Sequence, residues 1–207
     1  MGLTTNILIV DDHPLMRDAL DVASRKACGE CTNIIHADTI IMAKDVMKTA
    51  KPDLILLDLH LSDTSGFDGL NKIKSSCTTP IMIVTAQEGE NAVQTAQALG
   101  AKGYLKKSQS LDDMITAIQT VIDGNTSFPE MSDVKGDNDA LEKISRLTPA
   151  QNRVVGHLSD GLLNKQIAYE MGISEATVKA HMTAIFRKLG ANNRTQALLV
   201  YKEAIKV

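Results

Sequence analysis

The sequence contains no tryptophan, and aromatic residues make up only 3% of the chain. RNA-binding domains stack bases on aromatic side chains, so this scarcity argues against an RNA reader. No apolar run approaches the ~18–20 residues that a membrane-spanning helix requires. A dinucleotide-binding fold is disfavoured because no G-x-G-x-x-G follows the first predicted strand. The remaining composition, 43% hydrophobic and 23% charged, is typical of globular domains.

Cysteine is also scarce, with three residues, all in the first half of the chain. Cys28 and Cys31 match C-x-x-C, the spacing of a redox dithiol or of half a zinc site. A zinc site would need two further ligands, yet neither a second C-x-x-C nor an H-x-x-x-H occurs. The pair also falls in a turn between a predicted helix and strand, where no helix N-terminus would activate a thiol. We therefore expect unpaired thiols.

The N-terminus lacks the basic segment of a secretory signal and runs directly into a predicted core strand. Asn6 stands where a myristoylation motif has Ser or Thr. We therefore expect a cytoplasmic protein without a membrane partner.

The net charge of −3 is unevenly distributed. Residues 1–124 carry 11 Lys and Arg against 16 Asp and Glu, a net −5. Residues 125–146 carry 3 against 5, a net −2, and residues 147–207 carry 8 against 4, a net +4. An acidic first part and a basic last part predict separate tasks, with binding to a polyanion assigned to the last.

Residues 1–124 alternate short apolar runs with helical patterns. The predicted strands are residues 6–11, 32–37, 53–58, 80–85 and 102–105. A helix should begin with Asp38 as its N-cap and end near Ala50, and others should cover residues 91–99 and 111–122. The run 53–58 shows no polar alternation, which predicts a strand buried on both faces. The fold class is therefore α/β, a doubly wound five-stranded parallel sheet.

Residues 125–146 are turn-rich and acidic, which predicts a linker, although residues 139–144 are compatible with a short helix. From residue 147 onward the pattern predicts an all-α domain of four helices. Thr148, Asn164, Ser174 and Asn193 should open these helices. A short turn at Gly172 between the second and third helices predicts a helix-turn-helix at 147–207.

Functional residues should gather where parallel strands end. Asp11, Asp12 and Asp58 end two strands that should be neighbours, and packed carboxylates require protons or a divalent cation. Oxygen ligands suit Mg²⁺, which favours sites shared with a phosphate. Thr85 and Lys107 follow two other strands and could contact phosphoryl oxygens. This set predicts phosphoryl transfer to Asp58, which ends the most apolar strand, giving an acyl phosphate.

The third C-terminal helix separates into two faces. Its core face carries the apolar residues Val178, Met182, Ile185, Phe186 and Leu189. The opposite face carries small and cationic side chains that suit a helix in a DNA major groove: Ala176, Lys179, Ala180, Thr183 and Arg187. His181 lies at the edge of the apolar face and is interpreted as a packing residue. Three further residues are expected to contact phosphates and set the register: Lys165, Thr177 and Lys188.

Several motifs resemble a known family. Residues 7–122 resemble a receiver domain, on Val10-Asp11-Asp12-His13, Leu56-Leu57-Asp58-Leu59, Ile83-Val84-Thr85-Ala86 and GAKGYLKK at 100–107. Residues 147–202 resemble a LuxR-type DNA-binding domain, on LTP at 147–149, GLLNKQIA at 161–168 and SEATVKAH at 174–181. In this order the two matches resemble the NarL/FixJ response regulators of bacterial two-component systems, whose receiver has a flavodoxin-like fold.

This resemblance implies roles for the pocket residues. Asp58 would accept a phosphoryl group from a sensor histidine kinase, with Lys107 rather than Lys106 as its catalytic partner, because the family lysine comes three residues after an aromatic. Mg²⁺ would be held by Asp11, Asp12, Asp58 and the backbone carbonyl of His60. Thr85 and Tyr104 would form the switch pair. The chain would catalyse only its own phosphorylation and dephosphorylation.

The resemblance also implies promoter DNA as a partner, bound by a homodimer under the control of phosphorylation. In relatives the unphosphorylated receiver can cover the recognition helix, and charges of −5 and +4 lead us to expect the same docking here. Thr85 moving toward the phosphoryl group would let Tyr104 turn inward. One departure is Ser62, where the family usually has proline, and we expect a looser loop around His60.

Two other functions share some of these features. A phosphatase with an Asp nucleophile would also use an α/β sheet, but it needs a second Asp two residues after the nucleophile, where this chain has His60. A receiver that binds RNA or a protein is the other alternative, and the scarcity of aromatic residues weighs against RNA.

Overall fold

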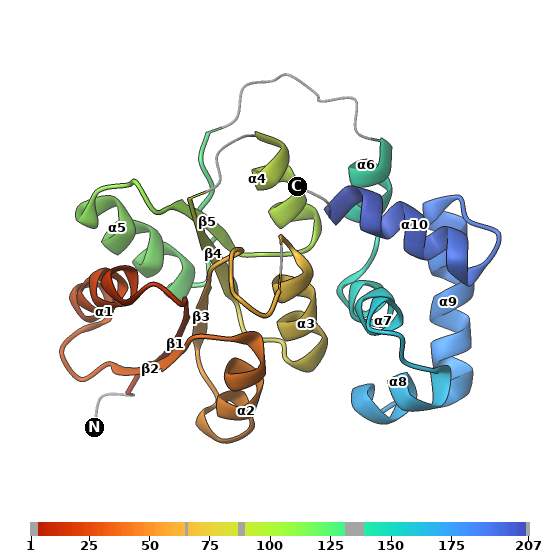
Figure 1. The fold of residues 1–207 in the computed structure, drawn as a ribbon, viewed down its shortest axis with the longest axis horizontal. Helices are drawn as coiled ribbons and strands as arrows, with labels where there is room; N and C mark the ends of the chain where they lie inside the picture. The colour runs from red at the N-terminus through yellow and green to blue at the C-terminus, as the bar shows by residue number, and fades with distance from the viewer. Residues whose placement is uncertain (1–3, 65, 87–89, 131–138, 206–207) are drawn as a thin grey trace.

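The computed structural model describes residues 4–64, 66–86, 90–130 and 139–205. They form a sheet flanked by helices and a second, all-helical domain beside it (Figure 1). Within these residues, no helix has both the length and the apolar character needed to span a membrane.

The sheet has five parallel strands in the order β2-β1-β3-β4-β5. The strands are β1 (Asn6–Val10), β2 (Asn33–Ala37), β3 (Leu54–Leu57), β4 (Ile81–Thr85) and β5 (Gly103–Lys106). Every residue of β3 and β4 is buried, as expected for strands covered on both faces. The predicted doubly wound α/β fold is confirmed.

Alternate residues of each strand feed two separate cores. Ile7 and Ile9 of β1 face α1 (Pro14–Cys28) and α5 (Leu111–Ile122), while Leu8 and Val10 face the other side. That other side is covered by α2 (Ile40–Ala50), α3 (Asp68–Ser76) and α4 (Glu90–Ala98). Adjacent residues of a strand therefore belong to opposite cores, and residues two apart belong to the same core.

The start of α2 corrects one prediction. Its N-cap is Thr39 and not Asp38, because the Met42 N–H donates to Thr39 Oγ1 at 3.2 Å. The end at Ala50 is confirmed. Cys28 closes α1 and Cys31 is exposed in the following turn, and both are free thiols, as expected.

The second domain contains α7 (Pro149–Ser159), α8 (Asn164–Met171), α9 (Glu175–Leu189) and α10 (Arg194–Ile205). Thr148 opens α7 as predicted and forms a capping box, since Gln151 N–H donates to Thr148 Oγ1 and Thr148 N–H to Gln151 Oε1. Asn164 is the first helical residue and not the cap, a position that Leu163 occupies. Gly172 has φ 64°, a left-handed conformation that glycine adopts without strain, and it makes the predicted turn between α8 and α9.

The predicted linker is structured at both of its ends, and the short helix considered for residues 139–144 is present. Ser127 runs beside β5, accepting a hydrogen bond from Tyr104 N–H at 2.9 Å and donating its own N–H to Lys102 O at 3.0 Å. Residues 139–145 form a further helix, α6 (Asp139–Ser145), which buries Leu141 and Ile144 between α4 and α10. The part of the linker prediction covering 131–138 lies outside the described residues.

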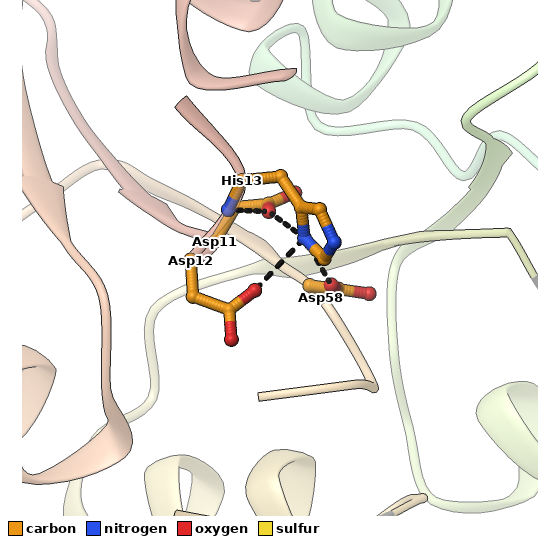
Figure 2. A group of neighbouring side chains, drawn as sticks. All are labelled: Asp11, Asp12, His13 and Asp58. Carbon is orange, nitrogen blue, oxygen red and sulfur yellow. Dashed lines mark hydrogen bonds and ion pairs between the residues drawn. The ribbon is translucent and has the colours of Figure 1, made fainter. Parts of the chain in front are cut away.

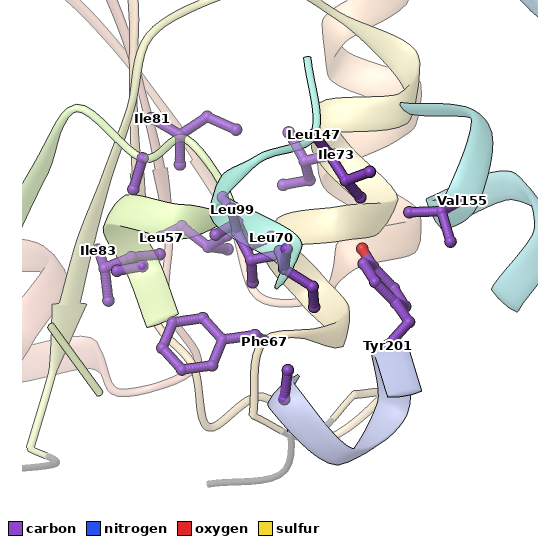
Figure 3. Close-up of a cluster of buried hydrophobic side chains, with 14 of the residues drawn as sticks. Leu57, Phe67, Leu70, Ile73, Ile81, Ile83, Leu99, Leu147, Val155 and Tyr201 are labelled. Carbon is purple, nitrogen blue, oxygen red and sulfur yellow. The ribbon is translucent and has the colours of Figure 1, made fainter. Parts of the chain in front are cut away.

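An apolar interface joins the two domains, with α3 against α7 and α4 against α6. Leu70 and Ile73 of α3 lie near Val155 of α7 and Tyr201 of α10 (Figure 3). Tyr201 is completely buried, and this burial raises the pKa of its phenol far above the usual range. Arg153 of α7 adds a polar contact, donating through Nε to Ser75 O at 3.3 Å.

Candidate functional site

The predicted pocket residues do meet at the carboxyl edge of the sheet. Asp11 and Asp12 follow β1, Asp58 follows β3, Thr85 ends β4 and Lys107 follows β5. Backbone hydrogen bonds fix them, from Asp58 N–H to Val10 O and from Lys107 N–H to Thr85 O, both at 2.9 Å. The positions of these residues therefore follow from strand pairing.

The Lys107 ammonium is the cation of this pocket. Its Nζ lies 2.7 Å from Asp58 Oδ2 and 2.8 Å from Asp11 Oδ2. Burial lowers the pKa of Lys107, but hydrogen bonds to the two carboxylates outweigh it, and the pKa is raised above its usual value. The choice of Lys107 over Lys106 therefore agrees with the geometry.

One oxygen of the Asp58 carboxylate has no partner. Asp58 is 1% exposed, and its Oδ1 has no hydrogen-bond partner among the described residues. A buried carboxylate oxygen is costly unless a cation or a donor reaches it. Together with the oxygens of Asp11 and Asp12, it forms a set of hard ligands that fits a small divalent ion such as Mg²⁺.

The loop after Asp58 is anchored despite Ser62. Asp63 accepts hydrogen bonds from Ile40 N–H at 3.1 Å and Ile41 N–H at 3.2 Å, the first amides of α2. Carboxylates are favourable at this end of a helix. The looseness expected from the absence of proline is countered by these two bonds.

Both predicted switch residues are buried. Thr85 is fully buried, and Tyr104 is 2% exposed within the core shared with α3 and α4. Their role as a switch pair, which the family resemblance implies, stays a prediction.

Sequence reasoning gave no role to His13, which the structure places in the pocket (Figure 2). Its Nδ1 lies 2.8 Å from Asp12 Oδ1, 3.2 Å from Asp11 Oδ1 and 4.0 Å from Asp58 Oδ2. The signal was available, because a residue directly after two strand-ending aspartates lies at the same edge of the sheet.

The two faces of α9 are as predicted. Val178, Ile185 and Leu189 are buried, whereas the stripe expected to enter a groove is exposed throughout: Ala176, Lys179, Ala180, Thr183 and Arg187. Lys179 Nζ lies 3.3 Å from Glu175 Oε1 on the helix surface. His181 is half-buried, consistent with its place at the edge of the apolar face.

The three residues expected to contact phosphates fall into two groups. Lys165 and Thr177 are exposed. Lys188 instead donates to Arg146 O at 2.8 Å and to Gln151 Oε1 at 2.7 Å, so it ties α9 to the start of the domain. The ammonium of Lys188 is therefore engaged within the domain, contrary to the phosphate contact expected for it.

The expected docking of the receiver over the recognition helix is wrong for this structure. The receiver packs against α6 and α7 and leaves the α9 stripe exposed. The interface is apolar, so the opposite net charges of the two domains do not decide where they meet.

These features define a class: an α/β domain with a charged pocket at its carboxyl edge, joined to a helix-turn-helix domain. Residues 7–119 match the response regulator receiver domain, and residues 145–201 match the luxR family of bacterial regulatory proteins. The chain belongs to the NarL/FixJ-type response regulators. It is a transcriptional response regulator and not a conventional enzyme.

Similar proteins share this architecture over nearly their whole length. The transcriptional regulatory protein YdfI of Bacillus subtilis (strain 168) is 32% identical, covering 94% of this chain and 93% of the relative. The glycerol metabolism activator of Pseudomonas putida is 34% identical over 93% of each. RcsB from Salmonella enterica serovar Typhimurium, solved bound to promoter P1flhDC, is 20% identical with a TM-score of 0.59, covering 98% of this chain and all of RcsB. The last likeness shows the fold alone.

Proposed function

We propose that Asp58 is the phospho-acceptor of this response regulator and that its phosphorylation controls promoter binding by α9. The observation that carries the proposal is the contact of one ammonium, Lys107 Nζ, with both Asp58 and Asp11. A cation held against a buried carboxylate at the carboxyl edge of a sheet is suited to receive a phosphoryl group.

The transfer follows from the same atoms. A sensor histidine kinase supplies the group as phosphohistidine, and a carboxylate oxygen of Asp58 attacks phosphorus. The P–N bond breaks, its electron pair leaves with the imidazole, and Asp58 becomes an acyl phosphate. Lys107 then contacts a phosphoryl oxygen, with the Thr85 hydroxyl as a second contact.

A divalent ion fits this chemistry. Asp11, Asp12, Asp58 and the backbone carbonyl of His60 would hold Mg²⁺, which neutralises the charge on the transferring group when it is bound. The observation that supports the fit is the buried, unpartnered Oδ1 of Asp58 beside two further carboxylates.

The exposed stripe of α9 supports DNA as the second ligand. Lys179, Ala180, Thr183 and Arg187 would face base edges in the major groove, while Lys165 and Thr177 contact phosphates. RcsB has been solved as dimers bound to DNA. By similarity, a homodimer on promoter DNA in the cytoplasm is the assembly that we propose.

The domain interface offers the path between the two sites. Thr85 ends β4, the strand that precedes α4, and α4 packs on α6 of the second domain. A shift of Thr85 toward a phosphoryl group would move α4 and thereby change the fit of α6 and α7 on the receiver. Control would act through this interface and not by covering α9.

The test is labelling of full-length protein with a radiolabelled small phosphodonor and Mg²⁺. Asp58→Asn should take up no label, because an amide oxygen is a poor nucleophile. The control Asp45→Asn changes an exposed carboxylate on α2 that pairs with the neighbouring Lys48, and it should label like the parent. Equal labelling of Asp58→Asn and the parent would contradict the assignment.

A further inference from the structure

His13 brings a nitrogen ligand to a pocket otherwise made of oxygens. Its side chain is 65% exposed, so an ion can reach it from solvent, yet its Nδ1 faces the carboxylates. One ligand atom from each of His13, Asp11, Asp12 and Asp58 lies within 4.8 Å of the others (Figure 2). These are the distances of a site that a single ion could span.

The backbone holds the imidazole in place. His13 is the N-cap of α1, with φ −93° and ψ 110°, directly before Pro14. Its N–H donates to Asp11 Oδ1 at 2.8 Å, and its carbonyl accepts from the N–H groups of Met16 and Arg17. Placement of the ring is therefore part of the local fold.

The distances suit a transition ion. Tetrahedral Zn²⁺ with bonds of ~2.0–2.1 Å separates its ligand atoms by about 3.3 Å. His13 Nδ1 lies 2.8 and 3.2 Å from the Oδ1 atoms of Asp12 and Asp11. Lys107 does not occupy these two Oδ1 atoms, because it contacts the Oδ2 atoms of Asp11 and Asp58. Asp58 Oδ2 is farther from the imidazole, 4.0 Å from Nδ1, so the ion would rest on His13, Asp11 and Asp12 and lie beside Asp58.

Ligand chemistry then separates two classes of ion. Carboxylates and carbonyls alone favour Mg²⁺, whereas imidazole favours Zn²⁺, Co²⁺ and Ni²⁺. We propose that His13 makes this pocket a site for such transition ions, and that Zn²⁺ bound there competes with Mg²⁺ and withholds Asp58 from phosphorylation. The second half of this proposal rests on Asp58 being the phospho-acceptor.

The first test measures metal binding to the full-length protein by competition with a chromophoric chelator. His13→Ala should lower the Zn²⁺ affinity on the order of tenfold or more. Its Mg²⁺ affinity should stay within about twofold, since Mg²⁺ takes water in place of an imidazole. Asp12→Ala should lower both.

The matched control is His36→Ala, which removes an exposed imidazole of β2 that lies outside this cluster. It should bind both ions like the parent. An unchanged Zn²⁺ affinity in His13→Ala, or an equal loss in His36→Ala, would overturn the proposal. If neither His13→Ala nor Asp12→Ala weakens Zn²⁺ binding, the ion is bound outside this pocket, and that result also overturns the proposal.

The second test measures labelling with Mg²⁺ and increasing Zn²⁺. Zn²⁺ should inhibit the parent and His36→Ala at concentrations that leave His13→Ala active. If Zn²⁺ inhibits His13→Ala as strongly as the parent while Asp58→Asn takes no label, this proposal fails and the function of Asp58 stands. If Asp58→Asn takes label, the proposed function fails whatever the metal titrations give.

Discussion

The acidic pocket and the exposed face of α9 differ in how their charged side chains are stabilised. In the pocket, Asp11 and Asp58 are 1% exposed, and a single ammonium balances both. On α9, Lys179 is 66% exposed, and its carboxylate neighbour Glu175 stands on the same helix surface. Buried charges depend on one another, whereas exposed charges are screened by water and act almost independently. Substitutions in the pocket should therefore reach the stability of the whole receiver, and those on α9 should not.

The largest expected effect is that of Lys107→Ala without Mg²⁺. It leaves two buried carboxylates without their cation, which should lower the free energy of unfolding by about 3–5 kcal/mol. Urea denaturation measures this, and saturating Mg²⁺ should restore part of the loss. Lys106→Ala, on the adjacent half-buried lysine, is the control and should change little. A similar loss in both variants would show that the pocket carboxylates do not depend on Lys107.

On α9, Lys179→Ala should weaken binding to a specific site by about 1–3 kcal/mol and leave the urea midpoint unchanged. Lys188→Ala should instead lower the urea midpoint and leave DNA binding unchanged, because its ammonium donates to Arg146 O and Gln151 Oε1 within the domain. Binding to a cognate site and to random DNA at one salt concentration separates the two. A loss on both DNAs alike for Lys179→Ala would mean that it contacts phosphate and reads no base.

Gly156→Leu tests whether docking of the receiver on the second domain affects DNA binding by α9. A Cβ at Gly156 of α7 would lie 3.7 Å from Asn71 O of α3, so alanine fits and leucine must push the helices apart. If docking keeps about nine molecules in ten from binding DNA, release would raise the apparent affinity about tenfold. The radius of gyration from X-ray scattering should rise together with DNA binding, and Gly156→Ala should match the parent. Wider separation of the domains with unchanged DNA binding would show that the interface does not gate α9.

The smallest effect should come from His157, a buried residue of α7. Burial lowers the pKa of His157 from its usual 6.5, so the folded protein resists protonation while the unfolded chain accepts it. Stability is therefore complete above this usual pKa and falls as pH drops below it. Urea midpoints at several pH values should show this loss in the parent and a smaller one in His157→Gln. Matching pH dependences would assign the loss to another group.

The pocket could be predicted because the topology of a parallel sheet determines where its residues meet. Asp11, Asp58, Thr85 and Lys107 each follow an apolar strand, and parallel strands bring their ends to one edge. The faces of α9 were predictable for a local reason, since helical spacing alone separates Val178 from Lys179. Both inferences needed only patterns along the chain.

The errors concern contacts between distant residues. Net charge predicted docking over α9, but the domains meet through apolar side chains such as Leu70, Val155 and Tyr201, which no charge count locates. Lys188 looked like a phosphate contact until the fold placed two oxygens beside it. The burial of Tyr104 likewise depends on distant residues, those of the core that it shares with α3 and α4.

The strap formed by Ser127 along β5 has a consequence for solubility. β5 is an edge strand, and the exposed edge of a sheet is a template for pairing with another molecule. Ser127 occupies the N–H of Tyr104 and the carbonyl of Lys102, which would otherwise face solvent. A receiver fragment cut at residue 124 loses this cover and should self-associate through β5, whereas one that extends to residue 130 should stay monomeric.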